Sequence, residues 1–191
     1  TDTNNDKIVA TLIDGGDVYI TKSGVIKPTD KLYGIENIIG TSGADTITGS
    51  SIANTIDGGA GNDTVKYDYL SGSNSVFVDL ASGNATVTGG VIDTLINIEN
   101  IIASANNDTI LMATGNTSNI IDGGNHTTAD TISYAAYSSN ITVNLGISGT
   151  QTIVAASNDI DTISNIEDLI GGSGNDSLTG NILNNTIDGG L

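Results

Sequence analysis

The amino-acid sequence predicts an all-β protein in which short parallel strands wind into a solenoid. Nine-residue units recur in phase, and most of them carry a glycine at the first position and a large apolar residue at the eighth. Thr, Ile, Val and Asn recur throughout while Ala and Leu do not dominate, which favours strands over helices. A chain of 191 residues is long enough for one such domain, so we expect a single solenoid segment over residues 1–191.

Charge and composition exclude several classes of protein. The chain has 22 acidic residues against five lysines and no arginine, a formal net charge of −17, and no lysine after Lys66. A nucleic-acid-binding protein needs a basic surface, and disulfides or thiolate metal sites need cysteine, which is absent. No apolar run reaches the roughly 18 residues of a membrane span. A packed acidic chain needs positive charge from elsewhere, and a divalent cation is the simplest source.

The nine-residue units are clearest in residues 40–66, which read GTSGADTIT, GSSIANTID and GGAGNDTVK. They return in residues 171–188 as GGSGNDSLT and GNILNNTID, and a degraded copy begins at 103 with ASANNDTIL. The first nine residues, TDTNNDKIV, align with that degraded copy. We therefore expect four irregular copies, which start near residues 1, 40, 103 and 171.

The units at 58–66 and 171–179 resemble the calcium-binding nonapeptide of the RTX (repeats-in-toxin, hemolysin-type) family, G-G-x-G-x-D-x-U-x, where U is large and apolar. The resemblance implies a right-handed parallel β-roll, in which six residues turn around a calcium ion and three form a short strand. It also implies that several Ca²⁺ ions are bound. Elementary chemistry agrees, because glycine lets backbone carbonyls converge and calcium takes about six to eight oxygen ligands.

Candidate ligands follow from the length of a coil. One coil takes two units, so Asp45 and Asp63, which are 18 residues apart, should meet on one edge. The resemblance predicts one ion between them, with carbonyls of Gly40, Ser42, Gly58 and Ala60. Facing carboxylates repel unless a cation lies between them. We therefore expect a calcium-binding ladder along this edge, with Gly171 and Ser173 beside its last member: Asp30, Asp45, Asp63, Asp93, Asp108, Asp130, Asp161 and Asp176.

A longer motif, D-x-[LI]-x-x-I-E-[ND]-[IL]-I, begins at Asp30, Asp93 and Asp161. The three glutamates of the sequence share one position in it, and spacings of 18 to 20 residues pair each with an asparagine on a second edge. These six residues form a second set of candidate ligands, in which asparagine offers only a neutral oxygen: Glu36 with Asn54, Glu99 with Asn119, and Glu167 with Asn185. Asp6 and Asp17 are candidates for a truncated site. The residues before three Gly-Gly pairs are expected to be solvated turn residues: Asp57, Asp122 and Asp188.

Residues 66–92 and 134–160 lack the nine-residue units and alternate apolar with polar residues, as half-buried strands do. We expect further coils or short hairpins that continue the solenoid. The pair Gly89–Gly90, just before Asp93, is interpreted as a loop of the same type shortened by one residue.

These observations favour a non-catalytic, calcium-folded structural module. His126 is the only histidine, so neither a zinc site nor a catalytic triad has its partners. The resemblance implies a protein secreted through a type I channel, and we expect a surface-layer or adhesin segment on a bacterial cell surface, with self-assembly or a cell-surface partner. One alternative is the C-terminal secretion and folding module of an exported enzyme or cytolysin. A minor alternative is an ice-binding solenoid, because threonines fill the seventh position of most units.

Overall fold

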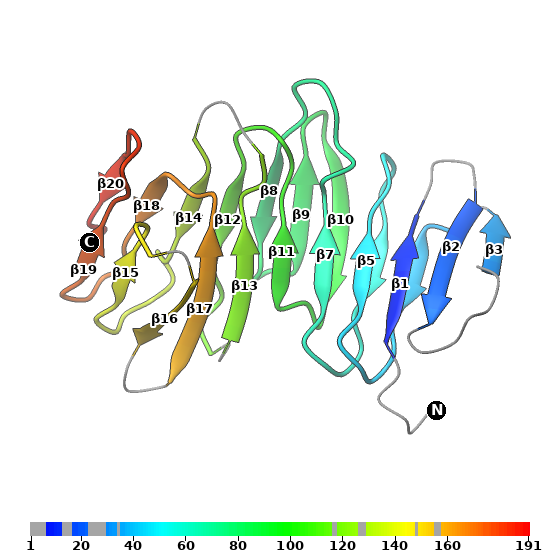
Figure 1. Ribbon diagram of the computed structural model, residues 1–191, viewed down its shortest axis with the longest axis horizontal. Helices are drawn as coiled ribbons and strands as arrows, with labels where there is room; N and C mark the ends of the chain where they lie inside the picture. The colour runs from blue at the N-terminus through cyan, green and yellow to red at the C-terminus, as the bar shows by residue number, and fades with distance from the viewer. Residues whose placement is uncertain are drawn as a thin grey trace.

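The computed structural model describes residues 7–12, 17–22, 30–33, 35–115, 118–125, 129–147, 149–154 and 158–191, with strands β2 and β3 described by their backbone alone. Every helix or strand in these ranges is a strand, and most strands lie in two nine-stranded sheets (Figure 1). The expected all-β fold of mostly parallel strands is confirmed. Within these ranges, no helix is long and apolar enough to cross a membrane. Asp6 and His126 lie outside the described residues, as do the side chains of Asp17 and Asp30.

The first sheet, called sheet A here, runs in the order β16-β17-β13-β11-β7-β5-β1-β2-β3. Its strands are β1 (Ile8–Thr11), β2 (Asp17–Lys22), β3 (Asp30–Tyr33), β5 (Thr46–Thr48), β7 (Thr64–Lys66), β11 (Asn100–Ile102), β13 (Ser118–Asp122), β16 (Gly149–Val154) and β17 (Asp159–Ser164). The strands from β1 to β17 along this order are parallel, whereas β2, β3 and β16 join the two ends of the sheet as antiparallel strands.

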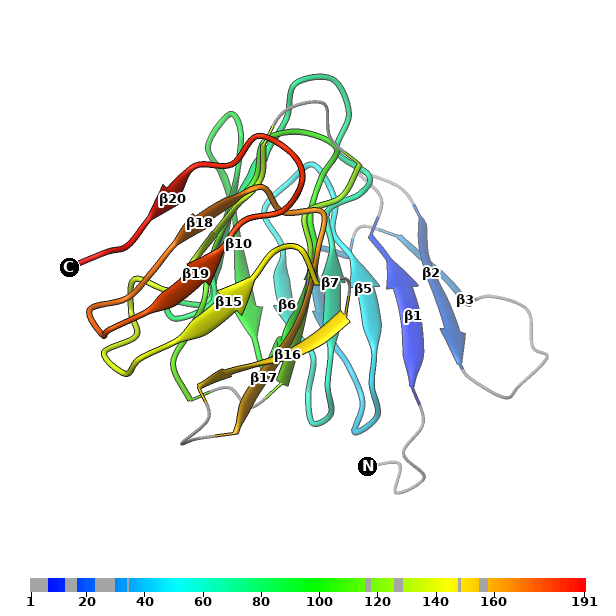
Figure 2. The same ribbon diagram turned by 60° about the vertical axis from the view of Figure 1, so that its left-hand side comes forward.

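The second sheet, sheet B, runs in the order β20-β18-β14-β12-β8-β9-β10-β6-β4. Its strands are β4 (Asn37–Ile39), β6 (Thr55–Asp57), β8 (Val76–Asp79), β9 (Asn84–Val87), β10 (Val91–Ile96), β12 (Thr109–Leu111), β14 (Thr131–Ser133), β18 (Asp168–Ile170) and β20 (Ile187–Asp188). A separate parallel pair joins β15 (Thr142–Asn144) to β19 (Ser177–Thr179). Figure 2 shows this pair beside β16 and β17, near the C-terminus.

The chain alternates between the two sheets, and this alternation makes the solenoid. Strands β4, β5, β6 and β7 fall in turn on sheets B, A, B and A, so a coil closes every two nine-residue units. The register pairs Thr46 with Thr64 in sheet A and Asn37 with Thr55 in sheet B. The expected coil of 18 residues is therefore confirmed for residues 37–66.

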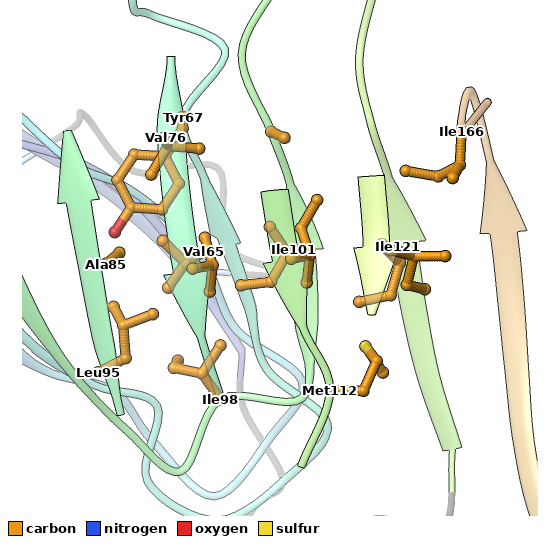
Figure 3. Close-up of a cluster of buried hydrophobic side chains, with 14 of the residues drawn as sticks. Val65, Tyr67, Val76, Ala85, Leu95, Ile98, Ile101, Met112, Ile121 and Ile166 are labelled. Carbon is orange, nitrogen blue, oxygen red and sulfur yellow. The ribbon is translucent and has the colours of Figure 1, made fainter. Parts of the chain in front are cut away.

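The core forms from the middle residue of each three-residue strand. In strands such as Thr46–Thr48 and Thr64–Lys66 the outer residues face outward and the central apolar residue faces inward, because side chains alternate along a strand. Ile47, Ile56 and Val65 are fully buried and stack on their equivalents in neighbouring coils. Figure 3 shows Val65, Ile101 and Ile121 lined up in this core. The predicted inward position of the eighth residue is confirmed.

The two stretches without nine-residue units are inserted into the sheets as hairpins. Residues 66–92 contribute β8, β9 and the start of β10, an antiparallel meander between β6 and β12 in sheet B. Residues 134–160 contribute β15, β16 and the start of β17, and β16 pairs antiparallel with β17. The interpretation of Gly89–Gly90 as a shortened loop is wrong. Both glycines have positive φ, and they form the tight turn of the hairpin between β9 and β10.

Candidate metal sites on the two edges

Polar residues at or just before the start of the strands form a column along the edge of each sheet. The strand register places five of them on the edge of sheet A, called edge A: Asp45, Asp63, Glu99, Asn119 and Asp161. It places seven on the corresponding edge of sheet B, called edge B: Glu36, Asn54, Asp93, Asp108, Asp130, Glu167 and Asn185. Most of these side chains are buried, and Asp63, Asp93 and Asp130 are at most 1% exposed.

Each buried carboxylate accepts a backbone N–H from the neighbouring coil. On edge A, Asp45 N donates to Asp63 Oδ1 at 2.7 Å and Asp63 N donates to Glu99 Oε2 at 2.8 Å. On edge B, Asp108 N donates to Asp130 Oδ1 at 2.7 Å and Asp130 N donates to Glu167 Oε2 at 3.2 Å. Hydrogen bonds from N–H groups to ionised acceptors are among the stronger ones. The columns therefore tie consecutive coils together as well as gathering negative charge.

The predicted pairs are confirmed, but the single aspartate ladder is wrong. Asp45 meets Asp63, Asp108 meets Asp130, and each glutamate meets its asparagine. However, Asp93, Asp108 and Asp130 lie on edge B, whereas Asp161 continues edge A. The physical reason is the meander β8–β9–β10, which carries the chain across sheet B three times. The next coil then begins half a turn out of phase, so aspartates and glutamates share both edges.

Two further members of the predicted ladder lie elsewhere. Asp30 begins β3, which is separated from β5 by β2 and β1, so it does not stack on Asp45. Instead, Ile8 N donates to Asp45 Oδ1 at 2.6 Å. Asp176 precedes β19 in the separate pair, where Ile141 N donates to its Oδ1 at 3.0 Å.

In four loops the side chain of the sixth residue accepts a hydrogen bond from a backbone N–H of the same loop, and we call these loops closed. The N–H of the second loop residue donates to the side chain of the sixth, as Thr41 does to Asp45 Oδ2 at 2.5 Å and Gly172 does to Asp176 Oδ2 at 2.8 Å. Ser104 N donates to Asp108 in the same way, and Ser50 N to the amide oxygen of Asn54. Thr41 O accepts Ala60 N at 3.1 Å rather than facing Asp45.

The three loops that begin with Asp-Gly-Gly have a different shape, and we call them open. Gly59 has a φ of 95°, which turns its N–H back to Asp57 Oδ1 at 3.0 Å and away from Asp63. Gly124 and Gly190 repeat this geometry, with N–H groups that donate to Asp122 and Asp188. The aspartates expected to be solvated turn residues therefore cap their turns and decide the course of the loop.

The longer motif supplies a partner for two of the open loops. Asn97 has a φ of 51° and donates through Nδ2 to Asp57 Oδ1 at 2.9 Å. Asn165 has a φ of 52° and donates to Asp122 Oδ1 at 2.7 Å. Both asparagines stand two residues before the glutamate of the motif, and neither is among the residues predicted for a site. Their common place in the motif, with a residue type that tolerates positive φ, was the available signal.

Asp93 and Asp161 serve a second purpose, which is to anchor the inserted hairpins. Tyr67 Oη donates to Asp93 Oδ2 at 3.0 Å, and Tyr134 Oη donates to Asp161 Oδ2 at 2.8 Å. Both tyrosines are fully buried, and burial beside a carboxylate raises the pKa of each phenol well above its ordinary value. Burial also raises the pKa of both aspartates, although the N–H and O–H donors oppose that shift.

Asp63 is the clearest candidate for a metal ligand. Its Oδ2 is buried and has no hydrogen-bond partner, and burial raises the pKa of this carboxyl to about 6. A Cβ at Gly58 would lie 2.6 Å from Asp63 Oδ2 and in contact with Asn97 O, so only glycine leaves room for these oxygens to converge. No group of three or more acidic or histidine side chains gathers around one point in the described ranges. Backbone carbonyls must therefore complete any site, which suits calcium because calcium accepts carbonyl and carboxylate oxygens together.

Comparison with known proteins agrees with this geometry. A family model described as the RTX calcium-binding nonapeptide repeat matches four copies, in residues 32–65 and 161–191. No curated protein matches the chain. RTX nonapeptide repeats are structural repeats that bind several Ca²⁺ ions, and the oxygen-rich glycine loops at both edges fit that ion. These two segments are therefore RTX calcium-binding nonapeptide repeats.

Proposed function

We propose that this chain is a calcium-locked structural module of a bacterial surface-layer or adhesin protein, exported through a type I channel and folded outside the cell. The observation that carries the proposal is the stacking of buried carboxylates on both edges. Asp63, Asp93 and Asp130 are almost completely inaccessible, and no lysine or arginine occurs after Lys66. Burying carboxylates in a region with so little positive charge is costly, so the folded state needs a cation to offset it.

The difference in calcium concentration between the cytosol and the outside of the cell determines where the chain would fold. Weak RTX-type sites remain empty at cytosolic calcium levels and fill at the roughly millimolar levels outside cells. The acidic chain then stays unfolded until export, and its own repulsion keeps it so. Outside, ion binding converts the repulsion along each edge into cross-links between coils. No reaction is needed for this role.

Exposed apolar side chains support a surface that meets other molecules. Ile182 and Leu183, which precede β20, are 101% and 57% exposed, and Ile39 on β4 is 75% exposed. Such side chains at the two ends of sheet B suit contact with further copies or with a cell-surface partner. The ice-binding alternative receives no such support. The outward threonine rows are interrupted by Asn100 in sheet A and by Asp168 in sheet B, and ice recognition needs a flat, regular array.

The test is a calcium titration of chelator-treated protein, followed by far-ultraviolet circular dichroism and by particle size in the same sample. We expect a cooperative gain of β signal near millimolar calcium, and magnesium should not replace calcium because it prefers a rigid shell of six ligands. Growth of the particles with calcium would favour a surface-layer protein over the folding module of an exported enzyme. A fully folded protein that ignores calcium would refute the proposal.

A further inference from the structure

We propose that the hydroxyls of Tyr67 and Tyr134 take, at Asp93 and Asp161, the place that a cation takes in the glycine loops. The two coils that carry inserted hairpins are then held together without an ion. Each tyrosine with its aspartate is called a brace here. This inference rests on the proposed function, since it decides which buried carboxylates need calcium, and it removes both aspartates from the predicted ligands.

The two aspartates lie inside strands rather than at the end of a glycine loop. Asp93 and Asp161 are each the third residue of a six-residue strand, β10 and β17, and both side chains are buried on the inward face. Each of these strands is paired on both sides, so its carbonyls are directed into the sheet. The loop before Asp63 instead turns on Gly59 and Gly61, both at positive φ. Carbonyls can therefore converge on Asp63 in a way that an extended strand does not allow.

The first brace crosses the core from sheet A to sheet B. Tyr67 follows β7 directly, its N–H donates to Ile102 O at 2.8 Å, and its ring lies among the buried side chains of the core (Figure 3). Its hydroxyl donates to Asp93 Oδ2 at 3.0 Å, while Asn54 N, at the start of β6, donates to Oδ1 at 2.8 Å. Each oxygen of this carboxylate therefore accepts a hydrogen bond, whereas Asp63 Oδ2 accepts none.

The second brace repeats these contacts in the opposite direction, from sheet B to sheet A. Tyr134 follows β14 directly, and its N–H donates to Ile170 O at 2.8 Å. Its hydroxyl donates to Asp161 Oδ2 at 2.8 Å, and Asn119 Nδ2 donates to Oδ1 at 2.8 Å. The half-turn that exchanges the acidic residues between the edges therefore exchanges the direction of the brace as well. Two inserts with different courses use the same arrangement of donors.

The residue that follows a repeat unit distinguishes a brace from a further loop. Gly49, Gly58 and Gly180 hold this place where another nine-residue unit follows. Tyr67 and Tyr134 hold it where a hairpin insert follows. A glycine here begins the next loop, whereas a tyrosine ends the row of loops and supplies a donor to the aspartate that closes the insert.

A phenol hydroxyl can satisfy a buried carboxylate as an ion does. Both tyrosines and both aspartates are fully buried. Hydrogen bonds to an ionised acceptor are roughly twice as strong as those between neutral groups. An ion that approached Asp93 or Asp161 would have to displace the hydroxyl and leave it without this acceptor at a buried position, which is costly. The braces therefore favour an ion-free joint at both places.

The first experiment counts calcium ions per chain by equilibrium dialysis at saturating calcium. Asparagine keeps one oxygen of the aspartate as an acceptor and removes the charge. We expect Asp93→Asn and Asp161→Asn to bind as many ions as the unsubstituted protein. Asp63→Asn is the matched loop variant and should lose one ion. Loss of an ion from Asp93→Asn or Asp161→Asn would overturn the inference.

The second experiment removes the hydroxyl and keeps the ring. We expect Tyr67→Phe and Tyr134→Phe to keep the ion count but to move the midpoint of the calcium titration, followed by circular dichroism, about twofold higher, because a less stable fold needs more calcium. Tyr69→Phe is the matched control. Its hydroxyl donates to a carbonyl, Ser50 O, at 2.5 Å, so the shift should be smaller. A gained ion or a lower midpoint in Tyr67→Phe would mean that the hydroxyl keeps calcium out of a real site.

The outcomes separate this inference from the proposed function. An unsubstituted protein that binds no calcium would overturn the proposed function alone. The braces would then be tested by urea unfolding, in which Tyr67→Phe and Tyr134→Phe must unfold at lower urea than Tyr69→Phe. Equal midpoints for the three variants would overturn the braces with or without calcium. Should Asp93→Asn lose its β signal, Asp161→Asn in the other sheet carries the same comparison.

Discussion

Loops 58–63 and 171–176 differ at only one position, since they read GGAGND and GGSGND, yet the structure gives them different courses. In the first, Gly59 takes a positive φ and Asp63 Oδ2 is left without a partner. In the second, Gly172 N donates to Asp176 Oδ2. The residue before each loop explains the difference, because Asp57 captures the Gly59 N–H and Ile170 has no side-chain acceptor. The nonapeptide alone therefore does not decide whether its aspartate is available to an ion.

The largest expected effect comes from substituting the glycine that redirects the loop. Gly59→Ala places a Cβ at a φ of 95° and against the carbonyl of Thr41, so we expect a loss of about 3 kcal/mol or more in the free energy of unfolding. Gly172→Ala, the matched variant, also meets a backbone carbonyl, that of Tyr137, but without a positive φ. It should cost about 1–2 kcal/mol less than Gly59→Ala. Urea unfolding at saturating calcium measures both.

A third variant isolates the backbone term. Gly72 has a φ of 73°, and a Cβ there would meet nothing within 4 Å. Gly72→Ala should therefore cost only about 1–2 kcal/mol. Equal losses at Gly59 and Gly72 would show that the close approach to Thr41 contributes nothing to stability.

The next effect tests the capping aspartate itself. Asp57→Ala removes the acceptor of two hydrogen bonds, from Gly59 N and Asn97 Nδ2, so we expect a loss of about 1–2 kcal/mol, as for a helix cap. The released Gly59 N–H should then turn toward Asp63 and weaken calcium binding at this loop. Asp122→Ala is the counterpart on edge B and should behave alike. Urea unfolding and equilibrium dialysis follow the two consequences separately. An unchanged calcium count in both variants would contradict the role given to the cap.

Much of the fold could be predicted from the sequence, because its cause is local. Glycine at fixed intervals sets the turns, and an apolar residue in the middle of each strand, such as Ile47 or Val65, sets the inward face. The spacing of 18 residues between Asp45 and Asp63 then fixes the coil. These features depend on neighbours within one or two coils.

The assignment of residues to edges could not be predicted in the same way. It depends on how many times the inserted residues 66–92 cross a sheet, and the apolar–polar alternation of that insert fits a whole coil as well as a hairpin. The role of Asn97 was also hidden, because its hydrogen bond to Asp57 joins residues 40 apart. The equivalent place of Asn165 in the longer motif was visible, but its meaning needed the fold.

Acidity offers a smaller, graded test of the open loop. Burial raises the pKa of Asp63 to about 6, above its value near 3.8 in an unfolded chain, so the folded state binds more protons between these values. In calcium-free protein, acidification from pH 7 to 5 should therefore shift the folding equilibrium toward the folded state, by about 1 kcal/mol from this residue. Asp159, whose pKa is also raised to about 6 by burial and by Asp161, should add a similar amount.

The substitution Asp63→Asn separates the two contributions. It should remove the share of Asp63 from the pH dependence and leave that of Asp159, as measured by the far-ultraviolet β signal of calcium-free protein at pH 5, 6 and 7. With calcium bound, the sign reverses for a ligand carboxylate, because protons then compete with the ion. A stability of the calcium-free protein that falls on acidification would contradict the buried, unpartnered state of Asp63.

The smallest effect concerns how a closed loop is held. Thr41 offers Asp45 both its backbone N–H and its hydroxyl, at 2.5 Å and 3.0 Å respectively, whereas Gly172 offers Asp176 only an N–H. Because the N–H alone suffices at residue 172, Thr41→Ala should keep loop 40–45 closed and cost only about 0.5–1 kcal/mol, the value of one hydrogen bond. Calcium binding should stay as it was, in contrast to Asp57→Ala. A loss above about 2 kcal/mol would mean that the hydroxyl closes this loop. The second residue of a loop, and not only the residue before the loop, would then set its course.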